Sequence, residues 1–207
     1  MQYLTKELKF PDVSQASTEG LLAIGGDLSP ERLLLAYSSG IFPWYDNDQP
    51  ILWWSPDPRF VLFPEKLKVS KSMKQLLKKE VFKVTYNSCF ENVIRECSKI
   101  KRDGQQGTWI TQEMVEAYTQ LHKLGYATSI EVWKDNVLVG GLYGVDLGNG
   151  IFCGESMFAK VSNASKYGFI SFIINTNFKL IDCQVYTEHL ASFGAEEIDR
   201  EVFLSYL

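Results

Sequence analysis

A carboxylate and an amide side chain stand two residues apart near the end of the sequence. Asp182 and Gln184 lie in Leu180–Tyr186, an apolar run that predicts a β-strand. Residues i and i+2 of a strand project to one face, so these two side chains should share a face while Cys183 points to the core. A carboxylate with a polar neighbour can act as a general base. It can equally be a strand-end residue that hydrogen-bonds backbone, and the residues alone leave both interpretations open.

A second carboxylate falls in a predicted strand, Ile151–Phe158, whose other residues are mostly apolar. Burying a charge costs free energy unless it is paired. Glu155 therefore either forms a salt bridge to a Lys or Arg or serves a ligand. Apolar residues of this strand and of a following helix could wall a pocket, or could simply pack in the core: Met157, Phe158, Phe169, Phe172 and Ile173.

Two tryptophans are candidates for stacking on a nucleic-acid base. Trp44 and Trp109 stand beside Pro or near Gly in predicted loops, where core packing is a weaker explanation for an aromatic residue. A base stacked on an aromatic side chain contributes about 1–3 kcal/mol. The alternative is a buried tryptophan between domains. Tyr37 and Tyr118 are weaker candidates because both fit the apolar stripes of predicted helices.

The charge of the chain is uneven. Net charge is −4, yet residues 64–83 carry seven lysines against two glutamates, a local excess of +5. A short amphipathic helix is predicted over residues 70–79, with Lys71, Lys74 and Lys78 on its solvent side. Such a patch binds phosphates without reading base sequence. The alternative is an ordinary solvated helix face.

The elements that must position these residues divide into two parts. Residues 1–63 hold six of the seven prolines and three of the five tryptophans, which is typical of turns and short strands. One helix is expected there, capped by Ser29, starting at Pro30 and ending before Gly40. From residue 64 the pattern becomes regular. We therefore expect a small N-terminal domain over residues 1–63 and a second domain over residues 64–207.

The second part alternates between strand and helix patterns. Ser88 and Glu91 form a capping-box pattern, and Thr111 is a helix cap. Strands are predicted over residues 81–86, 128–133, 137–145, 151–158 and 180–186, and helices over residues 88–99, 111–125, 163–178 and 188–193. The order is strand, helix, helix, three strands, helix, strand, helix. It matches the GCN5-related acyltransferase fold, an α+β arrangement in which helices flank a mixed sheet.

Metal, membrane and secretory functions find no support in the sequence. The four cysteines are scattered and there are only two histidines, so we expect no zinc site and reduced thiols in a cytoplasmic protein. The N-terminus lacks the pattern of a signal peptide. No run approaches the roughly 18 apolar residues that a membrane-spanning helix needs.

Seven segments carry an unusual density of Gly, Pro, Trp and polar residues. They are Gly20–Leu28, Gly40–Tyr45, Trp53–Arg59, Gly107–Ile110, Gly154–Phe158, Asn163–Lys166 and Leu180–Val185. In these segments the sequence resembles the leucyl/phenylalanyl-tRNA–protein transferases, from about Phe10 to the C-terminus. One departure is length, since some members extend beyond the position of Leu207.

The resemblance implies an aminoacyltransferase of the N-end rule pathway. Such an enzyme moves Leu or Phe, with Met left open, from aminoacyl-tRNA to the N-terminal α-amine of proteins that begin with Lys or Arg. This marks those proteins for degradation. The resemblance also implies a small N-terminal domain before a GCN5-like domain, and neither a metal nor a coenzyme. We expect a monomer.

The resemblance also assigns roles to the candidate residues. Asp182 and Gln184 match the family's proposed catalytic pair, and Trp44 and Trp109 match positions that face the terminal adenosine of the tRNA. Glu155 would bind the acceptor amine or its basic side chain, or orient the aminoacyl group. Apolar residues would receive the Leu or Phe side chain: Met157, Phe158, Phe172 and Ile173. The lysine patch would contact the acceptor stem.

Two other functions compete with this interpretation. An acetyl-CoA-dependent N-acetyltransferase of the same fold would need a glycine-rich loop to free backbone N–H groups for the pyrophosphate. The corresponding segment, residues 161–168, lacks that glycine spacing. A non-enzymatic RNA-binding module is disfavoured by the acidic remainder of the chain, and a turnover assay separates it from an enzyme.

Overall fold

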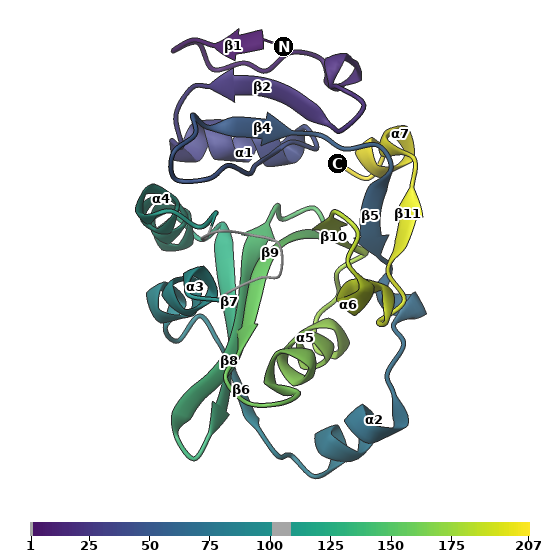
Figure 1. Cartoon of the computed structure of the whole chain (residues 1–207). Helices are drawn as coiled ribbons and strands as arrows, with labels where there is room; N and C mark the ends of the chain where they lie inside the picture. The colour runs from purple at the N-terminus through teal and green to yellow at the C-terminus, as the bar shows by residue number, and fades with distance from the viewer. Residues whose placement is uncertain (1, 101–108) are drawn as a thin grey trace.

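The computed structural model in Figure 1 describes residues 2–100 and 109–207. Gly107 and Thr108, which belong to one of the sequence motifs, lie outside the described residues. The first part of the chain forms a four-stranded sheet in the order β1-β2-β4-β3. Its strands are β1 (Gln2–Leu4), β2 (Leu21–Gly25), β3 (Phe42–Pro43) and β4 (Leu52–Trp54). Helix α1 (Pro30–Ser38) packs between this sheet and α4 (Gln112–Lys123) (Figure 1).

The rest of the chain builds a seven-stranded sheet and the helices that flank it, and the strand order is β11-β5-β10-β9-β8-β7-β6. Its strands are β5 (Arg59–Leu62), β6 (Lys83–Tyr86), β7 (Ala127–Lys134), β8 (Val137–Asp146), β9 (Ile151–Ala159), β10 (Leu180–Gln184) and β11 (Glu196–Ile198). The pairing of β9 with β10 is parallel, and the other pairs of this sheet are antiparallel. The sheet is therefore mixed, as predicted.

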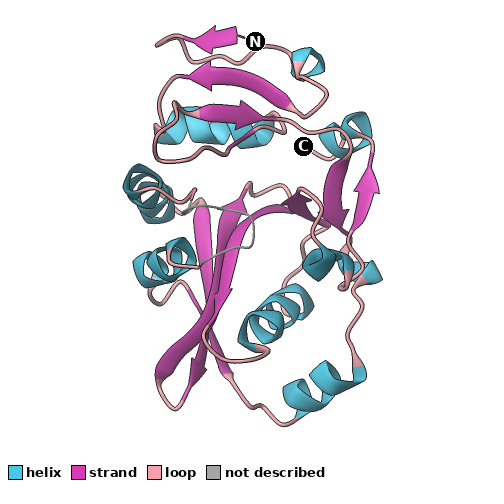
Figure 2. Ribbon diagram, viewed as in Figure 1, coloured by secondary structure: helices cyan, strands magenta, loops and turns pink. Residues whose placement is uncertain are grey.

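Helices cover both faces of this sheet (Figure 2). Helices α3 (Phe90–Ser98) and α4 pack on one face and α5 (Ala164–Ile174) packs on the other, with α2 (Lys71–Lys78) against α5. Two short helices follow, α6 (Glu188–Ala191) and α7 (Arg200–Leu204), and two 3-10 turns cover Val13–Gln15 and Pro64–Lys66. The predicted order of elements from β6 to α6 is confirmed, and so is the α+β class with helices flanking a mixed sheet.

The large sheet begins earlier than the predicted division at residue 63. Strand β5 lies before that residue, yet it pairs with β10 and β11. We therefore place the passage from the small sheet to the large one between β4 and β5. The two-domain division at residues 1–63 and 64–207 stays a prediction.

Two helix caps are confirmed and one is wrong. Ser29 and Thr111 cap α1 and α4 through their side chains. The predicted capping box at Ser88 is absent, because the N-cap of α3 is Cys89 and makes no side-chain cap bond. Its backbone N–H instead donates to the buried carboxylate of Glu131 on β7, at 3.3 Å. A strand residue thus supplies the acceptor that the local sequence was expected to provide.

Candidate active site

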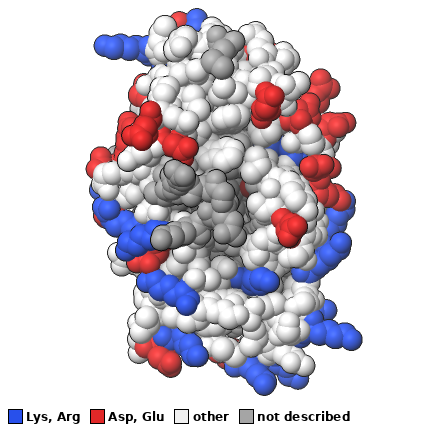
Figure 3. All heavy atoms as spheres, in the orientation of Figure 1, with Lys and Arg blue, Asp and Glu red and all other residues white. Residues whose placement is uncertain are grey.

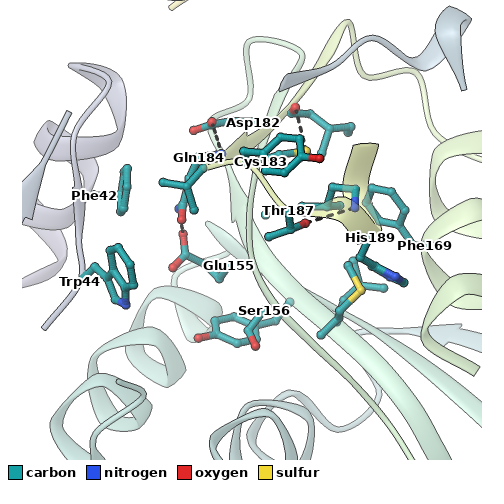
Figure 4. Close-up of a pocket in the computed structure, with 18 of the residues that line it drawn as sticks. Phe42, Trp44, Glu155, Ser156, Phe169, Asp182, Cys183, Gln184, Thr187 and His189 are labelled. Atoms are coloured by element: carbon teal, nitrogen blue, oxygen red, sulfur yellow. Dashed lines mark hydrogen bonds between the residues drawn. The ribbon is translucent and has the colours of Figure 1, made fainter. Parts of the chain in front are cut away.

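A cavity of about 480 Å³ opens where β9 and β10 part (Figure 4). Their parallel pairing ends at Asp182 opposite Cys153, while β9 continues to Ala159. Residues from both sheets and from the segments between them line the cavity. They include Phe42 on β3, Trp44 directly after it, Trp109 before α4, Glu155 and Met157 on β9, and Asp182 and Gln184 on β10. The parting of two parallel strands therefore creates the space, and the small sheet closes one side of it.

Both strands carry a β-bulge at this point. The register of β9 with β8 passes from Gly154 to Ser156, so Glu155 is the extra residue. The register of β10 with β5 passes from Asp182 to Gln184, so Cys183 is the extra residue, and Gln184 has φ 65°. Bulges interrupt alternation and redirect side chains. Simple alternation is therefore the wrong account of how these side chains are placed.

The carboxylate of Asp182 is completely buried and accepts three hydrogen bonds. Arg59 donates to both of its oxygens, from Nε to Oδ1 at 2.8 Å and from Nη2 to Oδ2 at 2.7 Å. Oδ1 also accepts the backbone N–H of Gln184, at 2.9 Å. Asp182 is thus placed to hold the end of β10 in shape.

Gln184 connects the end of β10 to Glu155 on β9. Its side-chain amide Nε2 donates to Oε1 of Glu155 at 2.8 Å (Figure 4). An amide has one N–H₂ group and one carbonyl oxygen. Oε1 of Gln184 has no donor among residues 2–100 and 109–207, so it can accept a hydrogen from a ligand. The structure thus brings the predicted pair together with the second candidate carboxylate.

Two tyrosines from distant helices complete the surroundings of Glu155. The hydroxyl of Tyr37 on α1 donates to Oε1 at 2.7 Å, and that of Tyr118 on α4 donates to Oε2 at 3.2 Å. The two hydroxyl oxygens are also in hydrogen-bond contact with each other. Each hydroxyl has one hydrogen, so the tyrosines can donate only two of these three hydrogen bonds at a time. Among the described residues the partners of Glu155 are therefore hydroxyls and an amide, and the Lys or Arg of the predicted salt bridge is not among them.

Glu155 titrates near neutrality in this environment. Burial is the largest cause, and it raises the pKa of Glu155 from 4.5 to about 7. The hydrogen bonds it accepts act in the opposite direction, and nearby Asp182 adds a smaller increase. Burial also raises the pKa of Tyr37 and Tyr118, so their hydroxyls stay protonated as donors. The carboxylate can consequently exchange a proton at physiological pH.

The two predicted stacking tryptophans both line the cavity. Trp44 is half-buried and leans on Trp54, with ring centroids 5.8 Å apart, and its carbonyl accepts the indole N–H of Trp54 at 2.7 Å. Trp109 is 9% exposed. Tyr37 and Tyr118, the weaker candidates for stacking, are buried and hold Glu155 instead.

The predicted apolar wall is only partly present. Met157 lines the cavity, and so does Phe169 of α5. Phe158, Phe172 and Ile173 do not line it, because they are buried in the core clusters on the two faces of the sheet. Phe172, for example, packs on the ring of Phe152, with centroids 4.6 Å apart.

Comparisons with known proteins decide the family. A model of leucyl/phenylalanyl-tRNA protein transferases matches residues 61–207, and a model of their N-terminal domain matches residues 26–57. A leucyl/phenylalanyl-tRNA–protein transferase from Flavobacterium johnsoniae is 63% identical over 100% of this chain and 99% of its own length. One from Syntrophus aciditrophicus is 58% identical over 99% and 86%. The chain belongs to the leucyl/phenylalanyl-tRNA protein transferase family. It is therefore an aminoacyltransferase.

Solved structures match more distantly. A Bacteroides thetaiotaomicron protein of unknown function has a TM-score of 0.48 at 13% identity, covering 80% of this chain and 58% of that one. A GCN5-related N-acetyltransferase from Kribbella flavida has a TM-score of 0.36 at 8% identity, covering 79% and 58%.

The lysine patch of the transferase lies on α2, where Lys71, Lys74 and Lys78 are all exposed. Figure 3 shows Lys and Arg gathered over the lower part of one face and Asp and Glu over the upper part. Within residues 2–100 and 109–207, no group of three or more His, Cys, Asp or Glu side chains could hold a metal ion. None of the helices in those ranges is long and apolar enough to cross a membrane.

The sequence did not predict that three further residues support the candidate site of this transferase: Arg59, Tyr37 and Tyr118. Arg59 opens an otherwise apolar strand, and a buried arginine there implies an anionic partner. The tyrosines fit helix stripes, but a buried hydroxyl requires a hydrogen-bond partner. The sequence therefore indicates that the arginine and the tyrosines need polar partners, but it does not show that these partners are Asp182 and Glu155.

Proposed function

We propose that this transferase moves Leu or Phe, with Met left open, from aminoacyl-tRNA to the α-amine of proteins that begin with Lys or Arg. It would act in the cytoplasm as a monomer, without metal or coenzyme, and mark its products for N-end rule degradation. The observation that carries the proposal is the cavity. In this cavity Gln184 and Glu155 lie beside apolar residues and two tryptophans.

The reaction makes modest chemical demands. The neutral amine nitrogen attacks the ester carbonyl carbon and loses one proton. The bond from that carbon to the ribose oxygen breaks, and the oxygen takes up one proton and leaves as a ribose hydroxyl. Amide formation from an ester is downhill, so the enzyme must chiefly hold two reactants and accept that proton. The attacking amine has a reference pKa near 8 and is partly protonated at neutral pH.

The arrangement of the cavity fits those demands. Oε1 of Gln184 accepts an N–H of the attacking amine, because the Nε2 group is bound to Glu155. The carboxylate of Glu155 stabilises the positive charge that develops on the amine and takes up its proton. Asp182 holds the backbone of Gln184 and stays paired with Arg59 throughout.

The donor binds along the rest of the cavity. Met157 and Phe169 contact the Leu or Phe side chain, and a thioether adapts to both shapes. The indoles of Trp44 and Trp109 pack on the terminal adenosine. The exposed lysines of α2 contact phosphates of the acceptor stem.

Removing either indole should weaken the binding of aminoacyl-tRNA but not that of the acceptor peptide. Trp44→Ala and Trp109→Ala should each raise the KM for aminoacyl-tRNA roughly tenfold, as expected for the loss of one stacked aromatic. The KM for the acceptor peptide should change much less. Trp133→Ala is the matched control, because Trp133 lies on β7 and its indole N–H donates to Thr85. Normal binding of puromycin by both cavity variants would refute the adenosine site.

Reversing the lysine patch should weaken tRNA binding and flatten its salt dependence. Lys71, Lys74 and Lys78 changed to Glu should each remove up to about 0.9 from the log–log slope of affinity against salt. Transfer from a minimal aminoacyl-adenosine donor should remain nearly normal. The control variant reverses three other exposed lysines, Lys6, Lys123 and Lys134, with the same change in net charge. An equal effect of the two triple variants would show that total charge, not the patch, matters.

The proposed activity is tested by transfer of labelled Leu from Leu-tRNA to a peptide with N-terminal Arg. We expect rapid labelling of that peptide and none of a peptide that differs only in an N-terminal Ala. Equal labelling of both peptides would refute the acceptor preference, and labelling of neither would refute the activity.

A further inference from the structure

Arg59 is one of the most deeply buried charged residues of the structure, with 1% of its surface exposed. It opens β5, and its side chain reaches three other parts of the chain. Two of its nitrogens bind both carboxylate oxygens of Asp182, and Nη1 donates to the carbonyl of Gly40 at 3.2 Å. Each nitrogen of the guanidinium therefore has an acceptor.

Aromatic rings also fix the plane of this guanidinium. Its central carbon lies 4.8 Å from the ring centroid of Phe42 and 4.7 Å from that of Phe203. Phe42 lines the cavity, whereas Phe203 belongs to α7 near the C-terminus. A planar cation with five donors suits such a site, and a lysine ammonium does not reproduce its geometry.

The C-terminal helix is docked so that Phe203 stays in place. Arg200 at the start of α7 donates through Nη1 to the carbonyl of Ser55 at 2.7 Å, and through its backbone N–H to Asp57 at 3.0 Å. At the other end of the helix, a Cβ added to Gly40 would lie 2.6 Å from a methyl carbon of Leu204. Chain segments before β5 and after β11 therefore pack directly around Arg59.

The contacts of Arg59 lead to the reacting groups in two steps. Arg59 fixes both oxygens of Asp182, and one of those oxygens holds the N–H of Gln184. That bond closes the bulge in which Gln184 adopts its left-handed conformation. The bulge in turn carries the Gln184 amide to Glu155. If Asp182 moved, Gln184 would lose its backbone hydrogen bond, and its side chain would no longer be held against Glu155.

We propose that Arg59 is a positioning residue for aminoacyl transfer, which fixes Asp182 and thereby the bulge that presents Gln184 to the attacking amine. The inference rests on the proposed function. A purely stabilising role explains the arrangement less well, because buried ion pairs often add little net stability over apolar residues. A displacement of about 1 Å at a reacting group, by contrast, can cost about 10²-fold in rate.

Kinetics of Arg59 variants test this role. Arg59→Ala should lower kcat for transfer to an N-terminal Arg peptide by about 10²-fold, with little change in the KM of a minimal aminoacyl-adenosine donor. Guanidinium ion, added below the concentration that unfolds the protein, should restore part of kcat by occupying the vacated space between the two rings. Urea at the same concentration should not. Arg59→Lys keeps the charge, and its folded molecules should still lose kcat.

Arg32→Lys provides the control. Arg32 is also 1% exposed, donates to the carbonyls of Thr5 and Glu7, and does not line the cavity. Its variant should lose thermal stability but retain kcat per folded molecule. Near-normal kcat in folded Arg59→Lys would overturn the proposal. So would a loss that only follows the folded fraction, or an Arg59→Ala variant that folds and gains nothing from guanidinium. Failure of the wild-type enzyme to turn over would instead refute the proposed function.

Discussion

Gln184→Ala should lower kcat by about 10²-fold or more, the usual span for help with proton transfer. The affinity for aminoacyl-tRNA should survive, because the side-chain bond of Gln184 goes to Glu155 and not to the tryptophans. Residual transfer should persist and should rise with pH, since an ester already reacts with a free amine. Single-turnover transfer with both substrates saturating measures the effect directly.

Asp182→Asn should cause a loss of the same order. The substitution keeps the shape but removes the charge opposite Arg59, and breaking a buried pair costs about 3–5 kcal/mol of stability. Rates must therefore be compared at a temperature where the variant is folded. The Asp182→Asn, Gln184→Ala double variant should be little worse than the worse single variant, because the two residues act as one unit. Strictly additive losses would refute the shared action.

Glu131→Gln is the matched control for these carboxylate changes. Glu131 on β7 is fully buried, accepts hydrogen bonds from Ser129 and Thr85, and does not line the cavity. Its amide variant should lose stability by about 1–3 kcal/mol, as expected for a disturbed buried acceptor, with kcat retained. Near-normal kcat in folded Asp182→Asn would contradict the role of that residue.

Glu155 should give the transfer rate a dependence on pH near 7. The pKa of this carboxyl is raised from 4.5 to about 7, so below pH 7 it carries a proton and cannot accept another. The rate should therefore rise as pH passes about 7, and rise further as the acceptor amine loses its proton near pH 8. Glu155→Gln should lower the rate by about 10²-fold. Its pH profile should keep the rise near pH 8, which comes from the amine, and lose the rise near pH 7.

The raised pKa of Glu155 should also make the stability of the protein depend on pH. Between about pH 4.5 and 7 the folded protein holds a proton on Glu155 that the unfolded chain has released. The contribution of Glu155 to the free energy of unfolding therefore falls as pH rises through that interval. Urea titrations at several pH values should show the decline in the wild-type protein and not in Glu155→Gln. A wild-type pH profile retained by Glu155→Gln would contradict the assignment in both measurements.

The sequence predicts those features that depend on local pattern. Helix caps at Ser29 and Thr111 follow from side-chain chemistry within three residues, and the order of strands and helices follows from periodicity. A carboxylate among apolar neighbours marks Glu155 as unusual without any structure.

The two bulges explain why the rest could not be predicted. Strand alternation counted from Phe152 fails beyond Glu155, because the extra residue there reverses which side chains face the cavity. Met157 consequently lines the cavity and Phe158 lies in the core. In the bulge, the backbone N–H of Gln184 is bound by Asp182, whose ion-pair partner Arg59 is 123 residues away in sequence. No local pattern carries information about such a contact.

The central claim is that the aminoacyl ester meets the amine in the cavity beside Gln184 and Glu155. A crystal structure of the enzyme with bound puromycin, whose amide replaces the reactive ester, tests this most directly. The adenine ring should lie against Trp44 and Trp109, the aromatic side chain against Met157 and Phe169, and the amide carbonyl next to Gln184. Puromycin bound with its carbonyl remote from Gln184, or bound outside the cavity, would contradict the account.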